Sequence, residues 1–341
     1  LRTACGIEGV GEVYAASFGP KTTVAMVEDV FGRYLEGRDP HHIERFWRRA
    51  HGSGFSQRPD PSMMGVVSAL EMACWDIIGK AANKPVYELL GGMVNERLRT
   101  YTDPAGPYTA FGGHQPDMEI LDRSEKFCRL IREAVGDKAD LLFGTHGQFT
   151  ASGAKRLARR LEPYDPLWFE EPTPPDMPEE MAKVAEATSI PIATGERLTT
   201  KWEFKRVLET GAASIIQMNL GRVGGILEGK KIAGMAEAFY AQIAPHLYCG
   251  PVVGAANVQL ATCTPNFLVL ESIRKWDGFH ADILKTPMGW EEGYVIPPKA
   301  PGLGVELNEE VALAPPYKGN ELHLQMSQEP FEVAGKPFGG G

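Results

Sequence analysis

From residue 99 onward, short apolar runs alternate with stretches of helical periodicity. The runs are Leu141–Phe143, Leu167–Phe169, Ile190–Ala193, Ser214–Gln217, Gln242–Pro245 and Phe267–Leu270. Most of them are followed by an amphipathic segment, for example Gly153–Leu161 or Pro178–Ala187. Strands that alternate with helices in this way are typical of parallel strands joined by crossover helices. The pattern therefore predicts an α/β fold for this part of the chain.

The first hundred residues have a different pattern. Residues 7–18 alternate apolar and polar positions around glycines, which predicts a small antiparallel sheet. Residues 23–49 have helical periodicity, and a long helix is predicted over residues 61–82. The apolar residues of that long helix recur at helical spacing on one face, which predicts a buried helix: Val66, Leu70, Ala73 and Ile77.

Polar groups stand at the end of almost every predicted strand. Within three residues of the run ends lie Gly144 (with His146 just beyond), Glu170, Glu196, Asn219, His246 and Glu271, at intervals of 23 to 27 residues. One strand, one helix and two loops need about that many residues. A barrel gathers functional groups at every strand end, whereas an open sheet gathers them at one switch point. We therefore predict a barrel.

One stretch does not fit a complete barrel. Residues 102–116 read TDPAGPYTAFGGHQP, which is a loop-like sequence, and the next predicted helix covers residues 124–134. A full barrel needs about one more strand–helix unit in this place.

Composition narrows the class of protein. The chain has 341 residues, 43% of them hydrophobic and 23% charged, and a net charge of −9, which is ordinary for a soluble globular protein. The negative charge argues against nucleic-acid binding, and we expect no membrane association because no apolar run approaches the ~20 residues of a span. Five scattered cysteines without a CxxC pair support neither a zinc ribbon nor a disulfide framework. We expect a cytoplasmic protein.

Two glutamates are the first candidates for chemistry. Glu170 and Glu196 each follow an apolar strand, where an unpaired carboxylate is expensive to bury. Carboxylates at the ends of neighbouring strands converge, and a hard cation such as Mg²⁺ is their simplest partner. The alternative is a pair of glutamates in structural salt bridges. Glu171 points the opposite way along its strand and is expected to make a structural contact.

Four further residues are candidates for acid–base work and substrate binding: His146, Asn219, His246 and Glu271. The two histidines can transfer protons at neutral pH, and Glu271 can hydrogen-bond the substrate. Asn219 can orient the His246 ring, but an amide cannot raise the pKa of that ring through charge as a carboxylate does. The alternative for each of these residues is a purely structural role, as a hydrogen-bonding group at the end of a strand.

Several motifs in order resemble those of the enolase superfamily. They are SALEMACWDIIGKAANKPVYELLGG, THGQ with RLARRLEPYDPLWFEEP, IPIATGERL, IIQMNLGRVGGILEGKKIAGMAEAF, IAPHLYCGP and NFLVLES, spread from Ser68 to Ser272. The chain is similar to the mandelate racemase/muconate lactonizing enzyme family, most closely to its galactonate and mannonate dehydratase-like members. This resemblance implies a TIM-like (β/α)7β barrel (99–300) with an α+β capping domain (1–98), and a C-terminal segment (301–341) that returns to the cap.

The resemblance also implies roles for the candidates. Glu170 and Glu196 match two of the family's three Mg²⁺ carboxylates, while Gly144 replaces the third, so that water or His146 would fill the gap. His246 matches the catalytic histidine, Glu271 the glutamate after the next strand, and His146 the histidine that protonates the departing hydroxyl. Asn219 stands where the family places the aspartate partner of the catalytic histidine.

The implied activity is dehydration of a sugar acid. Proton abstraction next to the carboxylate and loss of the 3-hydroxyl would give a 2-keto-3-deoxy acid, and a homo-oligomer is expected. Two alternatives stay open: a cycloisomerase or epimerase on the same scaffold, and a catalytically impaired homologue that binds a sugar acid, for which Gly144 and Asn219 argue.

Overall fold

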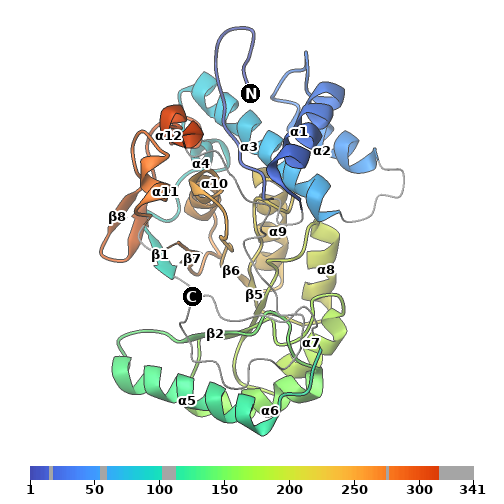
Figure 1. Ribbon diagram of the computed structural model, residues 1–341, viewed down its shortest axis with the longest axis vertical. Helices are drawn as coiled ribbons and strands as arrows, with labels where there is room; N and C mark the ends of the chain where they lie inside the picture. Colours follow the sequence, from blue (N-terminus) through green and yellow to red (C-terminus); the bar gives the residue numbers. More distant parts are fainter. Residues whose placement is uncertain (15–17, 54–59, 102–112, 274–275, 315–341) are drawn as a thin grey trace.

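The computed structural model describes residues 1–14, 18–53, 60–101, 113–273 and 276–314. In Figure 1 the first helices lie at the top of the molecule and the parallel strands lie below them. The top layer consists of α1 (Pro20–Tyr34), α2 (Ile43–Gly52), α3 (Pro61–Ala82) and α4 (Val86–Leu89). The helical stretch predicted over residues 23–49 is therefore two helices, because Gly37, with φ of +65°, and Pro40 interrupt it.

Helix α3 has the bounds that the sequence predicts, and local signals fix them. Asp60 caps its start by accepting hydrogen bonds from the amides of Ser62 and Met63, and Asn83 adopts the left-handed conformation at its end. By length and composition this 22-residue helix could span a membrane. We expected no such stretch from the sequence. Since 78% of its apolar window is buried inside the protein, it is a core helix.

The predicted sheet over residues 7–18 is wrong for its described part, residues 7–14 and 18. The segment forms no strand there beyond an isolated bridge between Arg2 and Glu8. Instead it lies against α3, so closely that a side chain at Gly9 or Gly11 would overlap carbonyl oxygens of that helix. The glycines that suggested turns serve this close approach. Residues 15–17 lie outside the described part.

Five parallel strands form one sheet in chain order: β2 (Leu142–Gly144), β3 (Trp168–Glu170), β4 (Ile192–Thr194), β5 (Ile215–Ile216) and β6 (Gln242–Ile243). The helices between and beside them are α5 (Met118–Val135), α6 (Ala151–Leu161) with the short 3-10 helix η1 (Glu162–Tyr164), α7 (Pro178–Ala185), α8 (Lys201–Glu209), α9 (Ile226–Ala238) and α10 (Pro251–Thr262). The predicted alternation of parallel strands and helices is confirmed.

A second sheet continues this series. Here β1 (Leu98–Tyr101) pairs in parallel with β7 (Leu270–Glu271) and antiparallel with β9 (Tyr294–Ile296), which pairs with β8 (Gly289–Glu291). A parallel bridge from Ile243 to Phe267 connects β6 to the residues just before β7. Helices α11 (Phe279–Asp282) and α12 (Glu309–Leu313) complete the described elements. Most of the loop-like stretch, residues 102–112, lies outside the described part.

The strands separate two buried layers. One layer of side chains gathers inside the curve of the strands: Trp168, Ala193, Ile215, Ala244 and Val269. Their strand neighbours point the other way and pack under the helices, as Phe169, Ile192 and Ile216 do. This alternation gives the strands an interior and an exterior, and it leaves the strand ends as the place where polar side chains can meet.

Buried carboxylates connect the top layer to the rest. Asp76 on α3 is fully buried and accepts hydrogen bonds from the amides of Val10 and Leu303 and from the Lys80 ammonium. Glu71, also on α3, accepts from the amides of Ile226 and Leu227 at the first turn of α9. Through the contact of Leu303 with Asp76, the segment around residue 302 packs on α3, and Gly302 forms an isolated parallel bridge with Pro85 just beyond that helix.

We predict that Asp76→Ala strongly destabilises the protein. The substitution strands two buried amides and the Lys80 ammonium, which costs about 3–5 kcal/mol for a buried charged pair that loses one partner. Urea unfolding measures this loss. As a control, Glu209→Ala breaks an exposed pair with Lys205 and should cost less than about 1 kcal/mol. Equal losses in the two variants would contradict the role of Asp76.

Candidate active site

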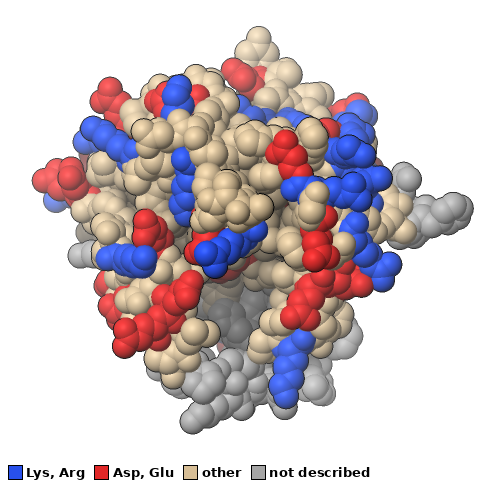
Figure 2. All heavy atoms as spheres, turned by 90° about the horizontal axis from the view of Figure 1, so that it is seen from above, with Lys and Arg blue, Asp and Glu red and all other residues tan. Residues whose placement is uncertain are grey.

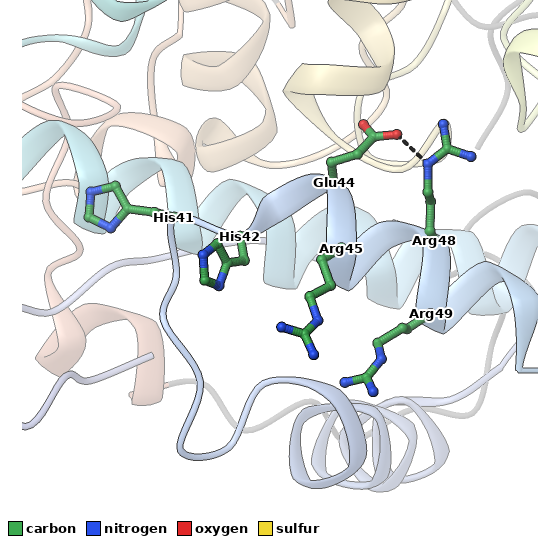
Figure 3. A pocket seen from close by; sticks show the side chains of 6 residues that line it. All are labelled: His41, His42, Glu44, Arg45, Arg48 and Arg49. Carbon is green, nitrogen blue, oxygen red and sulfur yellow. Dashed lines mark hydrogen bonds and ion pairs between the residues drawn. The ribbon is translucent and has the colours of Figure 1, made fainter.

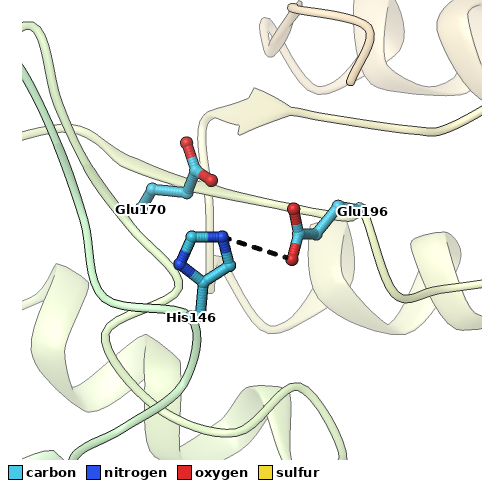
Figure 4. Close-up of side chains that lie close together, drawn as sticks. All are labelled: His146, Glu170 and Glu196. Atoms are coloured by element: carbon cyan, nitrogen blue, oxygen red, sulfur yellow. Dashed lines mark ion pairs between the residues drawn. The ribbon is translucent and has the colours of Figure 1, made fainter. Parts of the chain in front are cut away.

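All predicted site residues meet at the same ends of the strands. Gly144 and Glu170 are direct partners in the pairing of β2 with β3, and Glu196 follows β4 by two residues. Figure 4 shows the His146 imidazole between the carboxylates of Glu170 and Glu196. One ligand atom from each of these three residues lies within 4.8 Å of the others, a spacing at which they could share a metal ion.

Hydrogen bonds on either side hold His146 in a strained backbone conformation. Its φ is +48°, in the left-handed region that non-glycine residues seldom adopt. The two neighbouring amides fix the turn, because Thr145 donates to the carbonyl of Glu170 and Gly147 donates to the carbonyl of Glu171. A side chain at Gly147 would run into Arg197. Strained conformations of this kind are kept where the surroundings determine them, often at functional sites.

Glu170 is buried without a cation among the described residues. Its Oε2 accepts hydrogen bonds from Gln217 Nε2 at 2.6 Å and from Trp168 Nε1 at 3.1 Å, and both donors are neutral. Burial and the nearby charge of Glu196 raise the pKa of Glu170 well above its usual range. A carboxylate in this setting is held ready for a cation rather than satisfied by the protein.

Glu196 lies between the two histidines. Its Oε1 is 3.8 Å from Nε2 of His146, and its Oε2 is 3.0 Å from Nε2 of His246. Burial works against the ionised form, yet the two imidazoles lower the pKa of Glu196 to about 2. Burial likewise disfavours the charged His246 ring, but Glu271 and Glu196 raise its pKa to about 9. The two histidines therefore face one another across a single carboxylate.

Asn219 and Glu271 fix the surroundings of His246. Asn219 Nδ2 lies 2.8 Å from Nδ1 of the ring, while its Oδ1 accepts the amide of Gly221 at 2.8 Å. The second contact fixes the amide orientation, so that Asn219 donates to Nδ1 and the neutral ring carries its proton on Nε2. Glu271 Oε2 lies 3.8 Å from that Nε2 and accepts the amide of Leu247 at 2.5 Å.

Gly144 leaves room where a third carboxylate is expected. A Cβ built at this position would be 3.8 Å from Cβ of Glu170 and 3.9 Å from its Oε1, which are ordinary contact distances. Crowding therefore does not require glycine at residue 144, and a larger side chain would fit there.

Glu171 behaves as the sequence predicts. It is fully buried and pairs with Arg197 Nη2 at 2.6 Å, on the loop after β4. Burial and Glu196 raise its pKa to about 7, while Arg197 limits the rise. This pair ties the ends of β3 and β4 together and supports the backbone beneath Glu170.

The hydrogen-bond partners of the site glutamates were not identified from the sequence. Gln217, Trp168 and Arg197 complete the site, and only Gln217 stands at the end of a predicted strand. The polar residue at that strand end was the available signal for Gln217. No sequence signal identified Trp168, whose indole reaches Glu170 from two residues earlier on the same strand.

A separate groove lies away from the strand ends. A groove of about 560 Å³ runs along α2 and is lined by His41, His42, Glu44, Arg45, Arg48 and Arg49 (Figure 3). Its lining residues all precede α3, and Glu44 is paired there with Arg48. Seen from above, acidic and basic side chains are interspersed over the surface (Figure 2). The chemistry at the strand ends does not involve this groove.

We predict that Glu170→Gln stabilises the metal-free protein. Because the folded-state pKa of Glu170 is raised, the native carboxyl destabilises the fold increasingly as pH rises above its ordinary value, and the glutamine removes this effect. The expected gain in EDTA is about 1–2 kcal/mol at pH 8 and less near pH 5. Urea unfolding at both pH values is the measurement.

The matched control for this prediction is Glu228→Gln. Glu228 is as deeply buried as Glu170 but pairs with Lys201 and Lys231, so its neutralisation should destabilise the protein. A loss of stability in both variants at pH 8 would contradict the idea that Glu170 lacks a compensating charge.

Two family models match the chain. Residues 1–91 match the mandelate racemase/muconate lactonizing enzyme N-terminal domain, and residues 99–311 match the enolase C-terminal domain-like family. Among curated relatives, the D-galactonate dehydratase of Ralstonia nicotianae is 36% identical over 92% of this chain and 89% of its own length. That of Klebsiella pneumoniae is 35% identical over 91% of this chain and 88% of its own. Both relatives are named as dehydratases, which are hydro-lyases.

Solved structures agree with these matches. A mandelate racemase/muconate lactonizing enzyme-type protein from Labrenzia alexandrii is 64% identical, with a TM-score of 0.94 over 96% of this chain and 93% of that one. A protein of the same type from Roseovarius sp. TM1035 is 52% identical, with a TM-score of 0.93 over 96% and 92%. The chain is therefore an enzyme of the mandelate racemase/muconate lactonizing enzyme family, within the enolase superfamily.

Proposed function

We propose that the protein is a Mg²⁺-dependent dehydratase of a sugar acid. The observation that carries the proposal is the group of two histidines and Glu271 around the buried pair Glu170 and Glu196. Its relatives that act on D-galactonate match over nine-tenths of the chain, which favours an aldonic or aldaric acid as the substrate class. The site supplies both a proton acceptor and a proton donor, as loss of water requires.

The residues present fit a divalent cation. Glu170 and Glu196 offer carboxylate oxygens, and the donors to Glu170 among the described residues are neutral. His146 or water would complete the set in place of a residue-144 side chain. Hard cations such as Mg²⁺ favour this kind of oxygen-rich set. When bound, the cation would neutralise the negative charge that develops on the substrate carboxylate during proton abstraction.

The protein groups divide the proton transfers between them. We assign His246 to the proton on C2 and His146 to the departing hydroxyl on C3, with Glu271 hydrogen-bonded to the substrate carboxylate. The C2–H bond breaks and its electrons form a double bond to C3, the C3–O bond breaks, and the hydroxyl leaves as water with a proton. The enol product then tautomerises to a 2-keto-3-deoxy acid.

Asn219 influences how well His246 can perform its step. The neutral ring carries its proton on Nε2, the nitrogen that faces Glu196 and Glu271, because Asn219 donates to Nδ1. To accept the C2 proton on Nε2, the neutral ring must carry its own proton on Nδ1 instead, which requires the Asn219 amide to turn its Oδ1 toward Nδ1. An aspartate at position 219 would avoid this step by accepting a proton from Nδ1.

We propose a (β/α)7β barrel over residues 99–300, a cap of residues 1–98, and a C-terminal segment 301–341 that returns to the cap, as the contact of Leu303 with Asp76 supports. A homo-oligomer that works in the cytoplasm stays a prediction.

The test is a screen of aldonic and aldaric acids with Mg²⁺, followed by detection of 2-keto product. The wild-type enzyme should form such a product, and His246→Asn should lower the rate by about 10²–10⁴-fold because it removes a general acid–base group. An epimerase would instead exchange the C2 hydrogen with solvent without forming a keto acid. A cycloisomerase would give a lactone, and a catalytically impaired homologue would bind acids without exchange. Any of these three results, or full activity of His246→Asn, would contradict the proposal.

We predict that Gly144→Asp strengthens metal binding. The position has room for a side chain beside Glu170, and a third carboxylate should lower the Mg²⁺ dissociation constant by roughly tenfold or more. Isothermal titration calorimetry measures this change. The isosteric Gly144→Asn is the control, since it fills the same space without the charge. Equal affinities of the aspartate and asparagine variants would show that residue 144 does not face the cation.

A further inference from the structure

Tyr14 and Arg222 meet where the N-terminal segment crosses the strand ends. The Arg222 guanidinium lies over the Tyr14 ring, with its carbon 4.6 Å from the ring centroid. Arg222 belongs to the loop after β5, three residues beyond Asn219, and its amide donates to the carbonyl of Asn219. Gly221 lies against Tyr14, because a Cβ there would be 2.9 Å from Cβ of Tyr14. This contact therefore adjoins the pair of Asn219 and His246.

Both side chains carry hydrogen-bond donors that lack a carboxylate partner among the described residues. Nε of Arg222 is buried, yet it has no hydrogen-bond partner in the part of the chain that the structure describes. Among the described residues no carboxylate forms an ion pair with Arg222, and none is hydrogen-bonded to the Tyr14 hydroxyl. A buried guanidinium nitrogen without a partner is costly, and proteins keep such groups where an anion completes them.

Hydrogen bonds of the neighbouring residue Glu12 hold the segment that carries Tyr14 against the start of α10. Two residues earlier, Glu12 accepts hydrogen bonds from the amides of Gly250, Val252 and Val253 at the first turn of α10. That helix begins five residues after His246. Burial raises the pKa of the Tyr14 phenol, and the charges of Glu196 and Glu271 act in the same direction, while Arg222 opposes the rise.

We propose that Arg222 and Tyr14 form a subsite for a second carboxylate of the substrate, so that the enzyme acts on dicarboxylic (aldaric) sugar acids in preference to aldonic acids. The inference rests on the proposed function, in which the carboxylate next to C2 is bound by the cation and Glu271. A second set of donors, on the wall supplied by the N-terminal segment, then meets the far end of the chain. A guanidinium supplies the paired donors that a carboxylate accepts.

The experiment compares an aldaric acid and an aldonic acid of the same configuration. For the wild-type enzyme we expect kcat/KM to be at least about tenfold higher for the diacid, which corresponds to about 1.4 kcal/mol. Arg222→Gln should remove most of this preference, and Tyr14→Phe should reduce it less, since the ring under the guanidinium remains. The control is Arg159→Gln, an exposed arginine on α6, which should keep the wild-type ratio. Thermal unfolding confirms that each variant is folded.

Binding separates this inference from the proposed function. If no acid yields product, calorimetry with the same two acids still shows whether the diacid binds more tightly and whether Arg222→Gln removes the difference; that result would support the subsite and overturn the dehydratase. Product from both acids at equal kcat/KM in the wild type would overturn the subsite alone. So would an Arg222→Gln variant that loses activity toward both acids by the same factor.

Discussion

Several carboxylates share one buried space at the strand ends, and the structure is arranged around their mutual repulsion. Glu170, Glu171, Glu196 and Glu271 are all less than one-tenth exposed. Arg197 balances Glu171, and the two histidines lie beside Glu196 and Glu271. This leaves Glu170 as the carboxylate without a cationic partner among the described residues. Such an imbalance reduces the stability of the chain by itself. It also makes the site attractive to a cation. The Glu170 carboxylate thus lowers the stability of the fold and at the same time favours cation binding.

The strand ends could be predicted because their signal is local. An apolar run followed by a polar residue, repeated at a nearly constant interval, is enough to place Glu170 or His246 at the mouth of a barrel-like fold. The segment before residue 15 was misread because alternation around glycines also suits a chain that lies flat on a helix, as Gly9 and Gly11 do on α3. Which strand-end residue contacts which depends on spacing across strands, and the sequence carries no record of that.

Asn219 and Gly144 illustrate the limit of prediction by resemblance. Both depart from the family pattern, and both suggested an impaired enzyme. In the structure Asn219 is not a loose replacement: its two polar atoms are used, one on His246 and one on the amide of Gly221. Gly144 lies beside Glu170 with ordinary space around it, while the strained turn places His146 near the same carboxylates. The surroundings of each departure are thus well ordered, which favours altered chemistry over decay.

The contact of Glu12 with the first turn of α10 has a thermodynamic consequence. That turn follows His246 closely, so the N-terminal segment and the reactive end of β6 are attached to each other through one carboxylate. A ligand that contacts Tyr14 would therefore favour this attachment, and the attachment would favour the ligand by the same factor. Ligand binding at the strand ends and the packing of residues 1–14 against α10 are therefore thermodynamically linked.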